Sequence, residues 1–415
     1  MNTLSLFKNN FENKTCDNTN NQKQKVHKND YPYFNELLGR KIKGWECEEI
    51  IGKGTFGVIY KCFKEQTEEI SKKIEKITGA LKAEDQTKKV THIVKEIRIL
   101  ESLKKIQNGK NYFAEVLDYG EKRKFKFIIT TLFGSNLFDI LIQMPNQRIE
   151  IRTWIRVVIN IFEGLKHLHS IKVIHMDLKP ANIIVDYQNK RKNHEIVVRI
   201  IDFGLAKHLK YKNIAEEIPK NFVINNVTND KNDPYWIGSI FHCSPYIHKG
   251  YDSSYRDDIY SWLYVSMDLF KELPWSPNDT ELSIIKQKFN STINTYKNYF
   301  PIELESIIKS IVESPPNKPP DYDGILKDLK NFMQILTISW NEPCQWETIF
   351  GQKQTLQKQI NLSLKQSDFP DLMKKKISDN DIVGQNINEK EKNNNQNLKT
   401  NGFTNGKKKV KFINK

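Results

Sequence analysis

The chain lacks the features that mark membrane, secreted and zinc-binding proteins. No stretch approaches about eighteen uninterrupted apolar residues, and the Asn/Lys-rich beginning has no apolar run of signal-peptide length. The five cysteines (Cys16, Cys47, Cys62, Cys243 and Cys344) form no C-x-x-C pair. These absences predict a soluble, intracellular protein with reduced thiols and no zinc site.

Basic charge is concentrated at the two ends of the chain. Of the net charge of +15, residues 1–43 carry +4 and residues 351–415 carry +8, which leaves only +3 for the middle. Both ends are polar and poor in aliphatic residues, so they cannot bury enough apolar surface to offset the entropy of ordering. We expect two disordered ends around a folded region at 44–350, with neither a membrane nor a nucleic acid as partner.

A glycine-rich turn opens the folded region. Residues 45–63 predict a strand, a turn and a second strand, and Gly52, Gly54 and Gly57 have the spacing G-x-G-x-x-G. That spacing alone could equally open a Rossmann unit. A dinucleotide fold requires a helix after the last glycine, whereas residues 58–63 are β-branched and aromatic. The pattern therefore favours a hairpin that folds over phosphates.

The next stretches place a lysine and an acid within reach of each other. T-G-A-L-K-A-E puts Ala80 and Lys82 on a predicted strand, and apolar spacing from Val90 to Leu103 predicts an amphipathic helix that carries Glu96. The helix could return the Glu96 carboxylate to the lysine. Taken singly, the lysine could be a surface residue of an edge strand, and the glutamate a solvated helix residue.

Residues 126–132 predict a strand that leads into a connector. Helices are predicted from Asn136 and over 151–170, the second being a buried helix of a larger helical lobe. A loop rich in Asn, Lys and Asp covers 205–245, and a strongly apolar helix begins near Tyr255. Asp258, at the start of that helix, is also favoured there by the helix dipole.

Two short stretches indicate the chemistry. V-I-H-M-D-L-K-P-A-N (173–182) and I-I-D-F-G (200–204) contribute Asp177, Lys179, Asn182 and Asp202, which are two acids, a lysine and an amide. A metal-bound triphosphate needs ligands of these types. Either stretch alone is modest evidence, because an acid after an apolar strand is often a turn residue. Together and in this order they indicate a phosphoryl-transfer site.

Seven separated motifs, over Trp45 to about Glu347, resemble those of eukaryotic protein kinases. The chain is more narrowly similar to the casein kinase 1 superfamily, and within it to the tau-tubulin kinase branch. G-S-I-F-H-C-S-P-Y-I-H (238–248) lies where that superfamily has G-T-x-R-Y-x-S-I-N-x-H instead of A-P-E. R-D-D-I-Y-S-W-L-Y followed by L-P-W, and E-P-C-Q-W-E (342–347), extend the likeness.

The resemblance implies an α+β, bilobal protein kinase fold, with a β-rich N-lobe at about 44–133, a helical C-lobe at about 134–350, and ATP in the cleft between them. It implies that Asp177 accepts the substrate hydroxyl's hydrogen bond and that Lys179 lies against the γ-phosphate. Asn182 and Asp202 would hold Mg²⁺, and Glu96 would fix Lys82 on the α- and β-phosphates. Asp258 would tie its helix to the catalytic loop, the loop that carries Asp177. The implied ATP-binding residues are Ile51, Gly52, Lys53, Gly54, Thr55, Phe56, Gly57, Val58, Ala80, Lys82, Thr130, Leu132 and Ile184.

Lys179-Pro180 matches the Ser/Thr-specific pattern, and members of the family often favour acidic or already phosphorylated substrates. Two departures matter. Met176 replaces the arginine of H-R-D, which commonly pairs with a phosphate on the activation loop, so activation by loop phosphorylation is not expected. Residues 221–237 contain only one basic residue, Lys231, which puts recognition of a primed phosphate through this loop in doubt.

The alternative reading is a pseudokinase scaffold that binds nucleotide or partners without phosphoryl transfer. Its only support is Met176 and the loop, whereas the complete set of Lys82, Glu96, Asp177, Lys179, Asn182 and Asp202 favours an active enzyme. Near the end of the chain, Lys407–Lys411 resembles a nuclear address, and Lys409, Val410 and Phe412 fit a phosphatase-docking pattern. A solvated basic end explains both equally simply. We expect a cytoplasmic location, with the nucleus as the second candidate.

Overall fold

The computed structural model describes residues 37–54, 57–67, 74–85, 92–186, 196–209, 238–315, 318–349 and 351. Several sequence predictions fall outside these ranges: Thr55 and Phe56 of the glycine-rich turn, most of the 205–245 loop with Lys231, and both ends of the chain, including Lys409, Val410 and Phe412. Within the described ranges, no helix combines the length and apolar character needed to cross a membrane.

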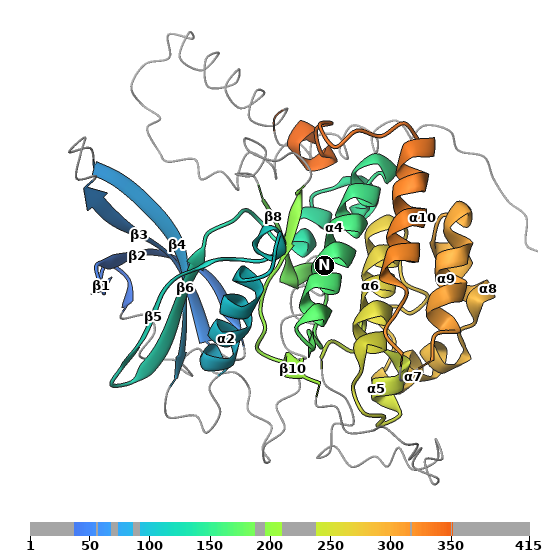
Figure 1. The fold of residues 1–415 in the computed structure, drawn as a ribbon, viewed down its shortest axis with the longest axis horizontal. Helices are drawn as coiled ribbons and strands as arrows, with labels where there is room; N and C mark the ends of the chain where they lie inside the picture. Colours follow the sequence, from blue (N-terminus) through green and yellow to red (C-terminus); the bar gives the residue numbers. More distant parts are fainter. Residues whose placement is uncertain are drawn as a thin grey trace, which may run out of the picture. The chain divides into compact units, whose positions relative to one another are not determined.

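A six-stranded antiparallel sheet forms the N-lobe, in the order β1-β2-β3-β4-β6-β5 (Figure 1). Its strands are β1 (Lys41–Ile42), β2 (Trp45–Gly54), β3 (Gly57–Thr67), β4 (Ile74–Asp85), β5 (Val116–Lys122) and β6 (Phe125–Thr131). The strands β2 and β3 pair directly across the glycine-rich turn. The hairpin prediction is therefore confirmed, and no helix follows the last glycine as a dinucleotide fold would require.

Gly57 is needed for packing as well as for the turn. A Cβ atom at this position would lie 1.9 Å from the carbonyl oxygen of Ala83 on β4. That separation is far below van der Waals contact, so any side chain here would push β3 away from β4. The glycine keeps the turn close to the strand that carries Lys82.

The helix α2 (Ile93–Lys104) packs against β5 and β6. Its buried residues include Ile93, Ile99, Leu100 and Leu103, which form the apolar stripe that the sequence periodicity predicts. Glu96 is also buried on the helix. An acid on the packed face of an amphipathic helix requires a partner, and this partner is described below.

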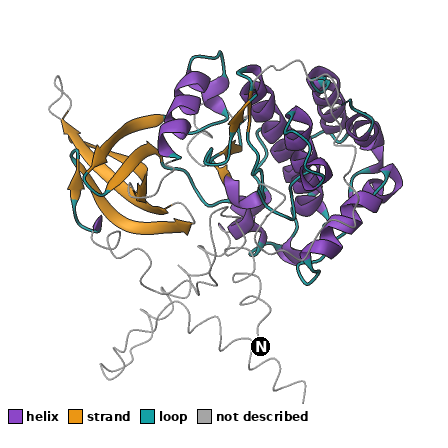
Figure 2. Ribbon diagram, turned by 90° about the horizontal axis from the view of Figure 1, so that it is seen from below, coloured by secondary structure: helices purple, strands orange, loops and turns teal. Residues whose placement is uncertain are grey.

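The C-lobe is helical and is built around α4 (Ile151–Ser170), which contacts α6, α10, β7 and β9 (Figures 1 and 2). Its other helices include α3 (Leu137–Leu141), α5 (Pro245–His248), α6 (Tyr255–Phe270), α7 (Glu281–Asn290), α8 (Ile293–Tyr296), α9 (Glu305–Val312) and α10 (Tyr322–Ile335). The short strands β7 (Val173–Ile174), β8 (Ile183–Val185), β9 (Val198–Ile200) and β10 (Lys207–His208) pair as β7 with β10 and β8 with β9.

The sheet begins earlier than the sequence predicted. Ile42 lies on β1, which pairs with β2, and both Ile42 and Leu37 are buried in the N-lobe core. The boundary placed between residues 43 and 44 is therefore a few residues late. The polar composition of this stretch concealed two isolated apolar side chains that pack beside Trp45 in the same cluster.

The E-P-C-Q-W-E motif closes the C-lobe against the start of α4. The Gln345 side-chain oxygen accepts from the backbone N–H of Glu150 at 2.8 Å, and the Gln345 N–H donates to Thr153 Oγ1 at 2.9 Å. Arg156 is fully buried, and its guanidinium donates to the carbonyl oxygens of Glu342 (2.5 Å) and Pro343 (3.2 Å). The motif thus provides a partner for the N–H of Glu150, the N-cap residue of α4, which makes no side-chain capping bond.

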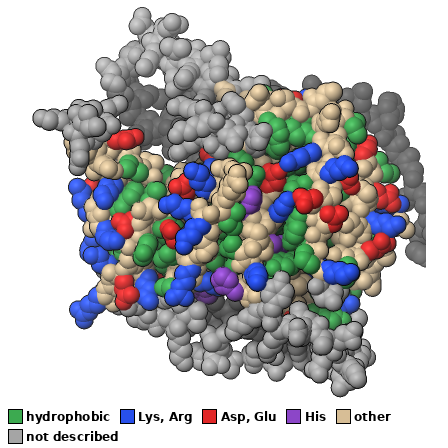
Figure 3. Space-filling model, in the orientation of Figure 1, with side chains coloured by type: hydrophobic (Ala, Val, Ile, Leu, Met, Phe, Trp, Pro, Cys, Tyr) green, Lys and Arg blue, Asp and Glu red, His purple; other side chains and the backbone are tan. Residues whose placement is uncertain are grey.

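Lysines on the sheet have acidic partners. Lys61 and Lys76 both approach Glu48, at 3.0 and 2.9 Å, and Lys43 lies 2.7 Å from Asp118. Figure 3 shows acidic and basic side chains intermixed over the helical part of the face in view. Exposed pairs of this kind contribute little to stability, but they offset the basic charge locally.

Replacing Arg156 with methionine should strongly destabilise the fold. The change leaves buried carbonyl oxygens of the 340–343 segment without donors, at a cost of about 3 kcal/mol in the free energy of unfolding. The comparison variant is Arg152→Met, which removes a more exposed guanidinium that pairs with Glu342 and bonds the carbonyl oxygens of Leu336 and Thr337, and its loss should be clearly smaller. Urea denaturation of the three proteins measures both values. Equal losses in the two variants would contradict the role assigned to Arg156.

Candidate active site

Lys82 on β4 joins two carboxylates from different parts of the chain. Its Nζ lies 2.9 Å from Glu96 Oε2 on α2 and 2.8 Å from Asp202 Oδ1, which follows β9. Strand, helix and loop therefore meet at a single ammonium group. The edge-strand and solvated-helix alternatives do not apply, since the side chains of Lys82 and Glu96 are only 14% and 8% exposed.

The protonation of this cluster is set by its charges. Burial alone would lower the pKa of Lys82, but Asp202 and Glu96 raise it well above its ordinary value. Burial alone would raise the pKa of Asp202, and Lys82 holds it well below the usual range. Burial raises the pKa of Glu96 against the opposing pull of Lys82. The result is a permanently charged lysine beside an ionised Asp202.

Asp177 is held from three sides. Its Oδ2 lies 2.9 Å from Lys179 Nζ and accepts from Asn182 Nδ2 at 3.2 Å, and its Oδ1 accepts from the backbone N–H of Ser239 at 3.0 Å. Asn182 also donates to the backbone carbonyl of Asp177 at 2.9 Å. Because the amide nitrogen of Asn182 is used in these bonds, its oxygen remains to face a cation.

Segment 238–248 lies directly against the catalytic loop, the loop after β7 that contains Met176 and Asp177. Gly238 has φ +97°, and a Cβ atom there would lie 2.3 Å from the carbonyl oxygen of Met176. Only glycine permits this approach. The approach brings the N–H of Ser239 to Asp177, a contact that the sequence motif did not reveal.

Asp258 lies under the catalytic loop at the start of α6. It is fully buried, and its carboxylate accepts from the backbone N–H groups of His175 (2.6 Å) and Met176 (2.9 Å) and from His169 Nε2 (2.9 Å). Burial alone would raise its pKa, but His169 and the other donors lower it. The two alternatives for this acid, helix-dipole partner and loop anchor, are both compatible with its position at the first turn of α6.

Two residues of the site have left-handed backbone conformations, Met176 (φ 69°) and Asp202 (φ 66°). Each costs about 1 kcal/mol or more and persists only where the surroundings hold it. The bond from the N–H of Met176 to Asp258, and the bonds of Asp202 to Lys82 and the Gly204 N–H, provide that support.

The side chain of Met176 is buried in an apolar cluster with Ile174 and Ile247. Partly buried Leu205, Leu209 and Tyr255 pack against this cluster. The chain after Gly204 is thus joined to the catalytic loop and to α5 by apolar contact at the position where the family has a charged arginine.

The remaining predicted nucleotide contacts lie on β2, β3, β4, the end of β6, the segment after it, and β8. Ala80 pairs with Thr130 across β4 and β6. Ile51 is 46% exposed, and Leu132 and Ile184 are half-buried, so these apolar side chains retain surface for a purine. Val58 differs, since it is buried in the N-lobe cluster with Tyr60. Gly52, Lys53 and Gly54 form the end of β2.

Sequence reasoning missed Lys288 of α7. This lysine is buried, and its Nζ donates to the carbonyl oxygens of Ile240 and Cys243, both at 2.6 Å. The ammonium also lies 5.1 Å from the Trp275 ring centroid and 5.2 Å from that of Tyr264. It therefore fixes the backbone of segment 238–248. No local pattern distinguishes it from Lys286, the other lysine of the same helix.

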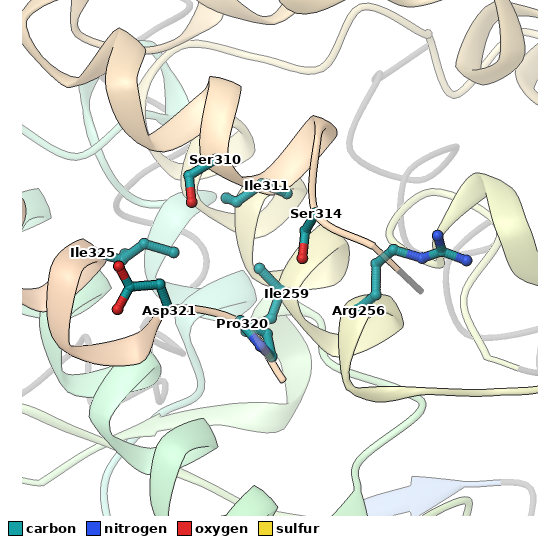
Figure 4. Close-up of a pocket in the computed structure, with 8 residues that line it drawn as sticks. All are labelled: Arg256, Ile259, Ser310, Ile311, Ser314, Pro320, Asp321 and Ile325. Carbon is teal, nitrogen blue, oxygen red and sulfur yellow. The ribbon is translucent and has the colours of Figure 1, made fainter. Parts of the chain in front are cut away.

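A separate pocket lies between α6, α9 and the start of α10 (Figure 4). Arg256, Ser310, Ser314 and Asp321 are its polar lining residues. None of the predicted catalytic or nucleotide-binding residues lines it, so it does not contribute to the arrangement around Lys82 and Asp177.

The arrangement suits transfer of a phosphoryl group. A charged lysine fixed by a helix carboxylate, an acid and an amide with free oxygens, and an aspartate beside a second lysine are the groups that position a metal-bound triphosphate and an incoming hydroxyl. The bilobal fold and this set of side chains define an ATP-dependent phosphotransferase that acts on a hydroxyl group.

The comparisons with known proteins give the family. A family profile described as "Protein kinase domain" matches residues 45–329, and the chain belongs to this family. A Caenorhabditis elegans protein named as a serine/threonine-protein kinase is 26% identical over 308 residues, covering 74% of this chain and 82% of its own. Another from that organism, named as a casein kinase I, is 26% identical over 320 residues, covering 75% and 85%. The chain is a protein serine/threonine kinase.

Among solved structures, that of vaccinia related kinase 3 matches with a TM-score of 0.52 and 17% identity, covering 72% of this chain and 90% of that one. At this identity the match shows the fold alone. It agrees with the predicted architecture of a sheet-rich N-lobe and a helical C-lobe.

Replacing Asp258 with asparagine should impair both folding and catalysis. An amide nitrogen cannot accept from the N–H groups of His175 or Met176, so the variant should lose about 2 kcal/mol of stability and about 100-fold in kcat. Asp252→Asn, an exposed acid just before the same helix, is the control and should leave both unchanged. Denaturation and steady-state kinetics measure the two effects. Wild-type kcat in a destabilised Asp258→Asn protein would contradict the proposed anchoring of the catalytic loop.

The stability that depends on Lys288 should vary with pH. Burial lowers its pKa from the ordinary 10.5 to about 8 in the folded protein. Between these values the unfolded chain binds the proton and the folded chain does not, so stability rises with pH. The free energy of unfolding of the wild type, relative to Lys288→Met, should increase by up to about 3 kcal/mol from pH 8 to 10.5. Lys286→Met, at an exposed position of the same helix, is the control. A pH-independent difference for Lys288→Met would contradict this account.

Proposed function

We propose that the protein is a casein kinase 1-like kinase that transfers the γ-phosphate of ATP to Ser or Thr hydroxyls without requiring phosphorylation of its activation loop. The carrying observation is that Lys82 contacts Glu96 and Asp202 simultaneously while Asp177 is already oriented by Ser239. The groups that kinase catalysis requires therefore stand together in the unmodified chain.

The proposed roles follow from these contacts. Lys82 binds the α- and β-phosphates, Asp177 accepts the hydrogen bond of the substrate hydroxyl, and Lys179 stabilises charge on the transferring group. The side-chain oxygens of Asn182 and Asp202 fit Mg²⁺, which prefers oxygen ligands and keeps phosphate oxygens among them. When bound, the metal neutralises charge on the phosphates. Ile51, Ala80, Thr130, Leu132 and Ile184 surround the adenine.

The casein kinase 1-like subtype is supported by two segments. Residues 238–248 contain the motif that replaces A-P-E and lie against Asp177 through Ser239, and residues 342–347 close the C-lobe against α4. One relative is named as a casein kinase I. The tau-tubulin kinase branch rests on the same two sequence motifs.

Independence from loop phosphorylation is supported by the surroundings of Met176. A phosphate needs cationic partners, and methionine in an apolar cluster provides none. Lys207 on β10 is half-buried, and its Nζ bonds Ser253 Oγ at 3.2 Å. Burial lowers the pKa of Lys207, and the nearby Asp257 and Asp252 oppose this shift. Apolar packing of Leu205 and Leu209 against the Met176 cluster takes over the anchoring of this part of the segment.

Substrate preference, docking and location are further proposals. Acidic or primed protein substrates follow from the family resemblance, and phosphatase docking follows from Lys409, Val410 and Phe412. A location in the cytoplasm, with the nucleus as the second candidate, rests on the cysteine usage and the basic end of the chain.

Phosphate transfer from Mg·ATP to casein and to tau, measured with radiolabelled ATP, tests the function. The protein is first treated with phosphatase and repurified, so that any activity belongs to the unphosphorylated chain. The wild type should transfer phosphate to Ser or Thr, and Asp177→Asn should lose several orders of magnitude in kcat while keeping its thermal stabilisation by Mg·ATP. Nucleotide stabilisation without transfer in the wild type would instead indicate a scaffold built on the kinase fold.

A further inference from the structure

Glu84 is a buried acid that the site described so far does not use. It lies on β4 two residues after Lys82, so the two side chains leave the strand on the same face. Glu84 is only 2% exposed, although it is not one of the two partners of the Lys82 ammonium group. Burying a carboxyl group is costly unless it accepts hydrogen bonds, so its contacts should show why it is retained.

Those contacts are with the start of α2. Glu84 Oε2 accepts from the backbone N–H of His92 at 2.7 Å and from that of Ile93 at 3.2 Å. The first turn of a helix has N–H groups without partners inside the helix. His92 is the N-cap residue and makes no side-chain capping bond. A strand residue thus supplies the cap that the side chain of His92 does not.

Opposing influences act on the Glu84 carboxyl group. Burial and the nearby Asp202 raise its pKa, while the attraction of Lys82 and of the N–H groups of His92 and Ile93 lowers it, and the net shift is upward. The helix dipole adds to the same attraction because its positive end faces the carboxylate.

The cap places a second tether on α2. The Lys82–Glu96 pair lies four residues after His92 on the helix. Strand β4 is therefore bonded to α2 at two positions, through Glu84 and through Lys82. A helix attached at one point can pivot, whereas attachment at two points one turn apart also fixes its direction. These two contacts from β4 hold Glu96 within reach of Lys82.

His92 extends the connection to the metal-binding segment. Its Nδ1 lies 2.8 Å from the carbonyl oxygen of Gly204, and because a carbonyl can only accept, Nδ1 carries the proton. The Gly204 N–H in turn donates to Asp202 Oδ1 at 3.2 Å, and that oxygen also bonds Lys82. The contacts therefore form a closed circuit through β4, the start of α2 and residues 202–204.

We propose that Glu84 is a positioning residue of this kinase: by capping α2 from β4, it keeps Glu96 on Lys82 in the absence of a phosphorylated activation loop. The proposal rests on the proposed function. It assigns the alignment of α2 to contacts inside the N-lobe, where a kinase that depends on loop phosphorylation would draw on contacts from the loop.

Three variants of Glu84 separate the length of its side chain, its charge and its ability to accept hydrogen bonds. Glu84→Gln keeps the length and one acceptor oxygen, Glu84→Asp keeps the charge but is one methylene too short, and Glu84→Ala removes the acceptor. Glu101→Ala removes an acid of α2 that makes no side-chain bond in the described residues and is the control. Each is studied as the full chain after phosphatase treatment.

Two readouts are measured. One is steady-state transfer to casein with varied ATP. The other is hydrogen exchange of the peptide that contains residues 92–97, which reports the first turn of α2 whether or not the enzyme is active.

Glu84→Ala and Glu84→Asp should exchange faster at this peptide, lose about 10- to 100-fold in kcat, and show a raised KM for ATP with the KM for casein within about twofold of wild type. Glu84→Gln should stay within about threefold of wild type in kcat. If the alanine variant does not fold, the contrast between aspartate and glutamine carries the test.

Exchange and kcat equal to those of Glu101→Ala in all three Glu84 variants would overturn the proposal. Equal losses in the Glu84→Asp and Glu84→Gln variants would also overturn it. Glutamine keeps an acceptor oxygen at the right distance and aspartate does not, so equal losses would mean that the capping bond is not the cause. Faster exchange in the alanine variant of a chain whose wild type transfers no phosphate would support the cap and overturn the proposed function instead.

Discussion

The site depends on one buried ammonium group. Lys82 comes from a strand, Glu96 from a helix and Asp202 from a loop more than one hundred residues further on, and none of the three could be buried alone at acceptable cost. Since each charge needs the others, the three elements must meet in one relative position. The same contacts that make burial tolerable also arrange the groups that would bind a nucleotide and its metal.

A second buried acid organises the other half of the site. Asp258 takes the backbone N–H groups of His175 and Met176, and this fixes the loop that carries Asp177. From the opposite side, the N–H of Ser239 reaches Asp177, and Lys288 holds the backbone of that segment through the carbonyls of Ile240 and Cys243. The loop that carries Asp177 and segment 238–248 are therefore held by backbone hydrogen bonds to buried charged groups, which rigidify this region.

Met176 is the residue on which the proposed independence from loop phosphorylation rests. Its backbone keeps the bond to Asp258, so the loop retains its conformation, while its side chain joins Ile174 and Ile247 in an apolar cluster. In the function proposed above, this apolar packing takes the place of the charged pairing that an arginine would offer. The contacts of Glu84 with the start of α2 support the same proposal, in which the unmodified chain aligns the site.

The sequence by itself determined the class of fold, the long helix at 151–170, the hairpin around the glycine-rich turn and the identity of Lys82, Glu96, Asp177, Lys179, Asn182 and Asp202. The helix and the hairpin follow from periodicity and turn residues, which are local properties, whereas the fold class and this set of residues follow from the resemblance of short motifs to those of protein kinases. Leu37, Ile42, Glu84, Arg156 and Lys288 were not identified, because each acquires its role from a partner distant in sequence or from burial. An acid two residues after a lysine, or one of two lysines on a helix, has no distinguishing local pattern. Only the tertiary structure decided which of these charges were removed from water, and burial is what gives a charge a structural role.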